Sequence, residues 1–373
     1  MMEIIVSIRN TTLGILYRLI LRPILFLFDA EAVHNLAIST GRFLGSNPIT
    51  KFLTSISFNY SNEILTQKVA GIEFKNPVGL AAGFDKDGYL TSILPSVGFG
   101  FAEIGSITGE PCEGNKKPRL WRIPKSKGIV VNYGLRNEGC RKIRARLRNK
   151  DFSIPIGVNV AKTNSAKTSV IREGIADYVK AYKSFLEIGS FYTINVSCPN
   201  TFGGEPFTDP QILDLLLTEI AKIESKKPVF LKMPPDLPKK QVDEIIGTAE
   251  NHKITGFVCS NLTKKRVKLA DKSVPVAGGI SGKPAEDAAN ELISYIYKKV
   301  GKKFVIIGCG GVFSAEDAYK KIKLGASLIE LITGMIYQGP QVVAEINQGL
   351  TRFLKKDGLE SLSEAVGLDN RPS

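Results

Sequence analysis

A short run of polar residues brings together the groups needed to remove a proton from a bound ligand. Asn195, Cys198 and Asn200 directly follow or end the apolar run at residues 192–196. A thiol has an unperturbed pKa of about 8.5 and ionises far more readily than a hydroxyl, so Cys198 is a candidate base near neutral pH. Asparagine amides offer paired donors and acceptors to a polar ligand. Residues of these types, close together at a strand end, could hold a polar ligand and exchange a proton with it.

Eight short apolar or β-branched runs are spaced so that they could position these groups. They alternate with longer helix-like segments, which is typical of repeated βα units and a parallel sheet. Eight units of this kind predict a (β/α)8 TIM barrel. The runs cover residues 78–82, 101–105, 154–160, 192–196, 229–233, 256–260, 304–308 and 328–332.

The chain divides into three expected parts. We expect an N-terminal helical extension and linker over residues 1–62, the barrel over residues 63–355, and a polar tail over residues 356–373. A barrel of this size forms one domain, so the extension is an appendage to it.

Polar residues and glycines follow nearly every predicted strand. In a TIM barrel the active site lies at the carboxyl ends of the strands, so these residues should face one mouth. Glycines after the last two strands can offer backbone N–H groups to a phosphate, although two tight turns would need the same glycines. The strand-end residues are Gly83, Asp85, Lys86, Ser106, Asn159, Lys162, Asn195, Ser197, Cys198, Asn200, Lys232, Ser260, Asn261, Gly310, Gly311, Thr333 and Gly334.

Composition narrows the classes of partner. The 373 residues include 50 Lys and Arg against 36 Asp and Glu, a net charge of +14 that favours anionic ligands or an acidic membrane surface. No basic stretch is interleaved with aromatic residues, so nucleic acid is not an expected partner. Five cysteines without a Cys-x-x-Cys pair, and two histidines far apart, indicate neither a disulfide framework nor a metal site. A reducing, cytoplasmic compartment is expected.

The first sixty residues read as amphipathic helices. Residues 13–28 are strongly apolar but fall short of a membrane span of about 20 residues and contain Arg18 and Arg22, so we do not expect them to cross a bilayer. The two arginines are four apart and share one helical face, which suits either a membrane interface or docking on the barrel or another subunit. Asp29 can cap a second helix that continues to Phe43, and residues 47–62 read as a linker.

Four segments carry a more specific signal. Together, and in this order, they resemble the dihydroorotate dehydrogenase family, and the resemblance runs from about residue 15 to about residue 350. It implies an FMN-dependent oxidation of dihydroorotate to orotate in pyrimidine biosynthesis. The segments are residues 76–88, 192–200, 277–284 and 306–312.

The resemblance also implies roles for individual residues. Cys198 corresponds to the base, and Lys232 to a cation that stabilises negative charge on the reduced flavin. Lys86 is expected to pair with the substrate carboxylate. The other expected substrate contacts are Asn132, Asn195, Asn200 and Asn261. The expected FMN contacts are Ala82, Gly83, Ser106, Asn159, Asn195, Lys232, Ser260, Gly282, Gly310, Gly311, Thr333 and Gly334, of which Gly310 and Gly334 come from the predicted phosphate turns.

Several positions depart from the family pattern. The N-terminal helices resemble those of the membrane-associated, quinone-using class 2 enzymes, whose base is a serine, whereas a cysteine base resembles class 1, which uses fumarate or NAD. Alignment without a gap puts Val131 at a substrate-binding asparagine, and a shift of one residue puts Asn132 there, which we expect. Leu262 replaces a hydroxyl residue, and Ile332 replaces a common tyrosine beside the flavin phosphate.

The resemblance leaves the acceptor more open than the substrate. We expect a quinone acceptor and a peripheral position on the cytoplasmic face of the membrane, with fumarate or NAD as the alternative; the oligomeric state stays open. A phosphosugar isomerase or lyase would share the barrel and its phosphate turns, but no glutamate is clearly placed as its base. A non-catalytic binding protein on the same scaffold is a third alternative.

Overall fold

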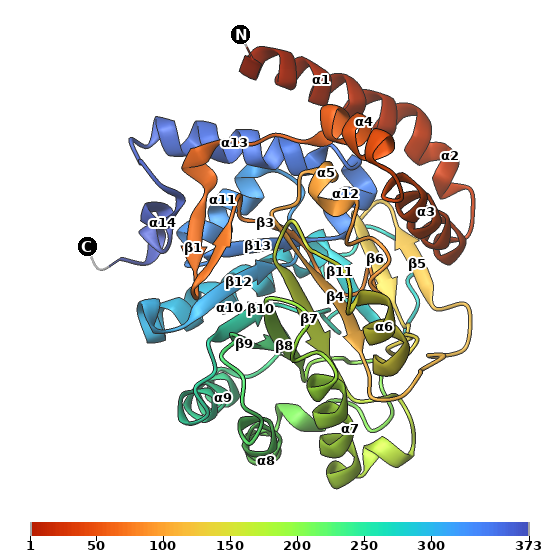
Figure 1. The fold of residues 1–373 in the computed structure, drawn as a ribbon, viewed down its shortest axis with the longest axis vertical. Helices are drawn as coiled ribbons and strands as arrows, with labels where there is room; N and C mark the ends of the chain where they lie inside the picture. Colours follow the sequence, from red (N-terminus) through yellow and green to blue (C-terminus); the bar gives the residue numbers. More distant parts are fainter. Residues whose placement is uncertain (1, 372–373) are drawn as a thin grey trace.

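The computed structural model describes residues 2–371, in which eight parallel strands close into a barrel surrounded by helices (Figure 1). All eight predicted strands are present, which confirms the (β/α)8 architecture. In order around the barrel they are β3 (Val78–Leu80), β4 (Phe101–Ile107), β7 (Ile156–Val160), β8 (Phe191–Asn195), β9 (Val229–Met233), β10 (Gly256–Cys259), β12 (Val305–Cys309) and β13 (Leu328–Leu331).

Helices pack around the strands as their apolar stripes require. Strand β4, for example, is buried along nearly its whole length, because the barrel interior covers one face and the helices cover the other. The helices after the first strand are α5 (Leu94–Val97), α6 (Cys140–Leu147), α7 (Ile171–Lys183), α8 (Pro210–Ala221), α9 (Lys239–Asn251), α10 (Glu286–Val300), α11 (Ala315–Lys323), α12 (Thr333–Gln338), α13 (Val342–Lys356) and α14 (Leu362–Ala365).

Aromatic side chains plug the end of the barrel where the strands begin. Phe101 and Phe191 are the first residues of β4 and β8, and Phe191 packs edge-on against Phe230 at 5.5 Å between ring centroids. Phe74, from the hairpin of β1 (Gln67–Val69) and β2 (Ile72–Phe74), packs against Phe101 at 5.4 Å. With this end closed, the opposite mouth at the carboxyl ends of the strands is left for a ligand.

A small antiparallel sheet adds a wall at that mouth. It consists of β5 (Leu120–Ile123), β6 (Gly128–Val131) and β11 (Gly279–Gly282), with β6 in the middle. The pairing places Gly279 opposite Val131 and so brings two distant stretches of chain beside the strand ends.

Four helical segments precede the barrel. They are α1 (Met2–Leu16), a π-helical turn (Tyr17–Leu21) that runs on into α2 (Arg22–Phe26), α3 (Ala30–Leu44) and α4 (Pro48–Phe58). As predicted, Asp29 caps α3 and accepts a hydrogen bond from the Ala32 backbone N–H at 2.9 Å. Residues 48–58 form helix α4, so the prediction of a linker over residues 47–62 is corrected. Asn47 caps this helix by accepting a hydrogen bond from the Thr50 backbone N–H, and Pro48 suits the first helical turn.

The first helix is also longer than predicted. Residues 3–26 form 24 helical residues that are long and apolar enough to cross a membrane by length and composition, so the expectation of too short a segment is wrong. The same test is passed by core helices and signal sequences, and this helix is docked along its length. Tyr17 donates to the Ile336 carbonyl at 2.7 Å, Arg22 to the Tyr337 carbonyl at 3.0 Å, and Arg9 to the Asn59 carbonyl at 2.9 Å.

The end of the chain packs on the barrel instead of trailing from it. Within residues 356–371, Leu362 and Ala365 are fully buried, and the Tyr297 hydroxyl of α10 donates to the Val366 carbonyl at 3.3 Å. The segment expected as a polar tail therefore contains α14 and a 3-10 turn (Leu368–Asn370) that contacts α10 and α11.

Candidate active site

One cavity of about 710 Å³ joins the mouth of the barrel to the N-terminal helices. Its volume suits a cofactor with a substrate. The structure brings most of the predicted site residues to its wall: Ala82, Gly83, Lys86, Ser106, Asn195, Cys198, Asn200, Lys232, Ser260, Asn261, Gly282, Gly310, Gly311, Thr333 and Gly334.

Two predicted contacts do not line the cavity. Asn159 is fully buried behind Ser106, whose hydroxyl donates to it, and its own amide donates to Glu103 at 3.1 Å. Asn132 faces a separate hollow, where its side chain accepts a hydrogen bond from Asn115 at 3.0 Å. Successive side chains of an extended segment point to opposite sides, so Val131 lines the cavity and Asn132 cannot. The choice of Asn132 over Val131 is therefore corrected.

Asn195 is held by hydrogen bonds on every side. Its amide donates to the Ser106 hydroxyl at 2.8 Å, and its side-chain oxygen accepts from Ser197 at 3.1 Å. Its backbone carbonyl accepts from the Tyr178 hydroxyl of α7 at 2.8 Å. Asn261 donates to the Ser197 carbonyl at 2.9 Å, which ties the end of β10 to the end of β8. Rotamers locked in this way can present amide groups to a ligand without further ordering cost.

Cys198 lies at the cavity wall on the loop after β8. Burial raises the pKa of its thiol to about 11, against a smaller lowering by the backbone hydrogen bond with Asn200 and by the charge of Lys162. The thiol form is therefore favoured at neutral pH in the ligand-free protein. A proton acceptor here must be activated by what binds beside it.

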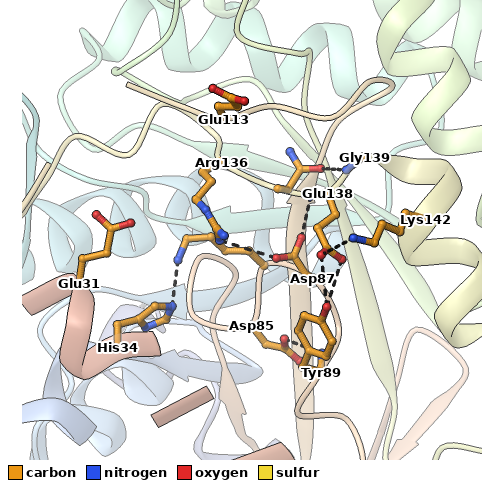
Figure 2. Close-up of polar contacts among 12 residues, drawn as sticks. Glu31, His34, Asp85, Asp87, Tyr89, Glu113, Arg136, Glu138, Gly139 and Lys142 are labelled. Carbon is orange, nitrogen blue, oxygen red and sulfur yellow. Dashed lines mark hydrogen bonds and ion pairs between the residues drawn. The ribbon is translucent and has the colours of Figure 1, made fainter. Parts of the chain in front are cut away.

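Lys86 lies beside His34 of α3, and its Nζ is 3.1 Å from Nε2 of His34 and 4.1 Å from the centre of the Tyr133 ring. Burial, followed by the charge of Arg136, lowers the pKa of Lys86 to about 7. Burial and the charge of Lys86 lower the pKa of His34 to about 2, so the imidazole is neutral and can accept from the ammonium group. In Figure 2 Arg136 and Asp87 face each other close to this contact, at 3.8 Å between Nη1 and Oδ2.

Lys232 projects from β9 into the base of the cavity between two carboxylates. Its Nζ lies 3.9 Å from Oε2 of Glu103 and 3.8 Å from Oε2 of Glu330. Burial lowers the pKa of Lys232, but its acidic neighbours Glu330, Cys309 and Glu103 together raise it by more, so the side chain remains a cation. Neither glutamate was singled out from the sequence, because both lie inside predicted strands where an apolar residue is the usual expectation.

The glycines after the last strands form a cradle that fits a phosphate group. Gly310 and Gly311 have φ values of +114° and +77°, which favour glycine, and a Cβ on Gly334 would lie 1.9 Å from the Val312 carbonyl oxygen. The hydroxyls of Ser281 and Thr333 lie beside this turn, 2.8 Å apart. Exposed backbone N–H groups and hydroxyls suit an anion, so the residues present are compatible with a flavin nucleotide.

The far wall of the cavity is apolar and comes from the N-terminal helices. Leu21, Leu25, Val33, Ala37 and Leu44 line it, as does His34, which the sequence analysis did not assign to the site. The repeating apolar positions of these helices signalled an amphipathic face, but they could not show that part of it encloses a cavity.

Comparison with known proteins agrees with this geometry. The sequence profile of dihydroorotate dehydrogenase matches residues 64–354. A protein from Trichodesmium erythraeum named dihydroorotate dehydrogenase (quinone) is 37% identical over 95% of this chain and 99% of its own length. One of the same name from Haloarcula marismortui is 38% identical over 94% of this chain and 98% of its own.

Solved structures agree as well. The crystal structure of DHODH from Eimeria tenella in complex with ferulenol superposes with a TM-score of 0.83 and 29% identity, over 92% of this chain and 96% of that one. The family match covers most of the chain, and the relatives span nearly its full length. The chain therefore belongs to the dihydroorotate dehydrogenase family.

Proposed function

We propose that the protein oxidises dihydroorotate to orotate with bound FMN and passes the electrons to a quinone. The observation that carries this proposal is the single cavity, which has amides and cations at the strand ends and an apolar wall from the N-terminal helices. A polar, anionic substrate suits the first part, and an apolar acceptor suits the second.

The substrate end supports a division of roles. Lys86, when protonated, pairs with the orotate carboxylate, while Asn195, Asn200 and Asn261 bind the amide edges of the ring. When bound, FMN supplies the two-electron acceptor for the hydride that leaves the pyrimidine ring. Cys198, once its thiol has lost its proton to solvent, accepts the proton from the adjacent ring carbon as a thiolate, and Lys232 stabilises negative charge that accumulates at the base of the cavity.

The helix end supports a quinone acceptor in a membrane. Tyr17, Arg18 and Arg22 turn the polar side of the first helix toward the barrel, which leaves its apolar side outward. The outward side chains continue over α3 and α4 and include Leu19, Ile20, Ile24, Leu36, Phe43, Ile49, Phe52 and Ile56. Exposed apolar side chains on amphipathic helices suit the interfacial layer of a bilayer, where quinones dissolve. We propose peripheral binding at the cytoplasmic face.

An acceptor survey tests the function directly. Purified protein should be yellow, release FMN on denaturation, and reduce a short-chain quinone at the expense of dihydroorotate, with little turnover on fumarate or NAD. Robust turnover with fumarate and none with quinones would overturn the acceptor and keep the substrate. A colourless protein that binds no flavin would instead favour the phosphosugar isomerase or lyase alternative.

A further inference from the structure

Two buried glutamates share one buried lysine at the base of the cavity. Glu330 of β13 and Glu103 of β4 are both fully buried, and each approaches the ammonium group of Lys232 to within 4 Å. A buried carboxylate without a cation or hydrogen-bond donor is strongly disfavoured, because burial removes its hydration. One lysine can compensate one carboxylate, so the second carboxyl group has to be stabilised in another way.

The two carboxyl groups have different surroundings. Glu103 accepts hydrogen bonds from the Thr193 hydroxyl and from the Asn159 amide, which stabilise its ionised form. Within residues 2–371, neither carboxyl oxygen of Glu330 has a hydrogen-bond partner. The negative charge therefore belongs on Glu103, and the neutral form belongs on Glu330.

The other neighbours do not change this balance. Cys309 of β12 pairs in register with Glu330, and burial raises the pKa of its thiol to about 12, so it adds no charge. Burial and the charge of Glu103 raise the pKa of Glu330 well above its usual range, against a smaller lowering by Lys232. Both Glu330 and Lys232 line the cavity, so their charge acts on whatever occupies it.

We propose that Glu330 holds a proton at neutral pH, and that this proton sets the redox potential of the flavin by keeping the cluster of Lys232, Glu103 and Glu330 at a net charge of zero. The inference rests on the proposed function. Loss of the proton would bring the cluster to −1, and a negative charge beside the flavin disfavours the addition of electrons. Glu330 is thus a positioning residue. It acts through Lys232, because its protonation sets the net charge of the cluster.

The sign of the pH dependence follows from this arrangement. Near neutral pH Glu330 is already protonated, so it contributes nothing to the change of potential with pH. At alkaline pH it ionises in the oxidised protein, and the negative charge added by two electrons draws one proton from solvent back onto it. Over the pH range in which Glu330 is ionised in the oxidised protein and protonated in the reduced protein, the midpoint potential of the flavin should fall more steeply with pH than it does near neutral pH. Above that range the potential should remain lower than it would be with a neutral side chain at position 330.

Redox titration of the FMN-bound protein against pH tests the proposal. Glu330→Gln replaces the protonated carboxyl by a neutral group of the same shape. Its midpoint potential should match wild type near neutral pH and lack the steep alkaline segment. Glu345→Gln is a matched control, because burial also raises the pKa of Glu345 but this residue lies on α13 outside the cavity wall. It should reproduce the wild-type curve.

Two results would overturn the proposal. A potential for Glu330→Gln that is clearly higher than wild type at neutral pH would mean that Glu330 is ionised there, and curves that superimpose at every pH would mean that it has no influence. Infrared difference spectra of wild type minus Glu330→Gln give an independent readout. At neutral pH they should contain the carbonyl band of a protonated carboxylic acid, shifted in D₂O; absence of this band also refutes the proposal.

The infrared readout separates this inference from the proposed function. It needs neither substrate nor flavin, so a protein that bound no flavin would refute the proposed function while the spectra still decided whether Glu330 carries a proton. Conversely, a flavin-loaded, active protein without the band would retain the function and lose the inference.

Discussion

The barrel mouth and the N-terminal helices differ in where their polar and apolar side chains lie. Along the strands nearly every apolar side chain is buried, and the polar groups at the mouth are locked by mutual hydrogen bonds. Over residues 3–58 polar side chains such as Tyr17 and Arg22 contact the protein, one set of apolar side chains lines the cavity, and many large apolar side chains are exposed. Beyond residue 58, the large apolar residues that are exposed in the described chain are only Val170, Phe202, Leu215, Val267 and Val276.

This contrast suggests that the two regions serve different half-reactions. The rigid mouth suits a step that needs precise placement of substrate and base, and the helical wall suits admission of an apolar acceptor. Substitutions at the mouth should therefore impair reduction of the flavin by dihydroorotate. Substitutions in the helices should impair its reoxidation by quinone, and leave the first step intact.

The largest effect should come from Cys198. Cys198→Ala removes the proton acceptor, so flavin reduction by dihydroorotate in anaerobic rapid mixing should slow by about 10²–10⁴-fold. Cys198→Ser should keep FMN, and near neutral pH its rate of flavin reduction should lie between those of wild type and Cys198→Ala. Because burial raises the Cys198 pKa to about 11, the wild-type rate should increase with pH across the accessible range.

Reoxidation by quinone provides the internal control for the Cys198 variants, since the reduced protein can be prepared with dithionite. It should proceed at the wild-type rate in both. Reduction of Cys198→Ser that is as fast as wild type, or faster, would argue against the thiol as the base.

The next effect should come from the ion pair that docks α3. Glu31 and Arg119 are both buried and joined by two hydrogen bonds, of 2.8 and 3.1 Å. Glu31→Gln leaves Arg119 without its counter-ion, which should cost about 3 kcal/mol of docking free energy. Hydrogen exchange in α3 should accelerate by roughly 100-fold, and the KM for quinone should rise.

Lys117→Gln is the matched control, because Lys117 also approaches Glu31, at 3.6 Å, but is 66% exposed. Its loss should cost under about 1 kcal/mol. Flavin reduction by dihydroorotate should be unchanged in both variants. A Glu31→Gln protein that loses this step as strongly as quinone turnover would break the division between the two regions.

Binding to lipid vesicles is a third measurement that distinguishes the N-terminal helices from the barrel. Leu19 is 72% exposed on the outward face of the first helix, so Leu19→Glu should change the free energy of unfolding by no more than about 0.5 kcal/mol. It removes about 2 kcal/mol of apolar contact with lipid, so affinity for vesicles containing anionic lipid should fall by at least about tenfold. Val267→Glu, at an exposed site far along the chain, should keep wild-type affinity, and equal binding by all three proteins would contradict the membrane face.

The same contrast explains what could be read from the sequence. The eight strands were predictable because parallel strands buried on both faces leave continuous apolar runs, as at residues 229–233. The mouth was predictable because Cys198 and Lys232 follow or end such runs. Side chains alternate along the strand, which places Val131 and not Asn132 at the cavity. The alignment was uncertain by one residue here, and the shift that we expected selected the side chain on the wrong side.

What the sequence could not show were contacts between distant segments. His34 meets Lys86 across 52 positions, and Glu103 and Glu330 meet at Lys232 from three different strands. The linker prediction failed for a local reason, since Asn47 and Pro48 together are a helix start and were interpreted as the beginning of a linker. Burial likewise changed the chemistry of Cys198, whose pKa depends on surroundings that are remote in sequence.

The effect expected to be smallest near neutral pH is a pH dependence of substrate binding that originates where the two regions touch. In the free protein burial lowers the pKa of Lys86 to about 7, so above that pH a growing share of the lysine is neutral and cannot pair with the orotate carboxylate. The dissociation constant of orotate, measured from the change in flavin absorbance, should rise by up to about tenfold for each pH unit above 7 and level off below it. His34→Gln should keep an acceptor beside Lys86 and preserve the profile, whereas Lys86→Met should abolish it. A flat profile in wild type would show that Lys86 remains charged across this range, and that the buried contact with His34 leaves the substrate end independent of the helices.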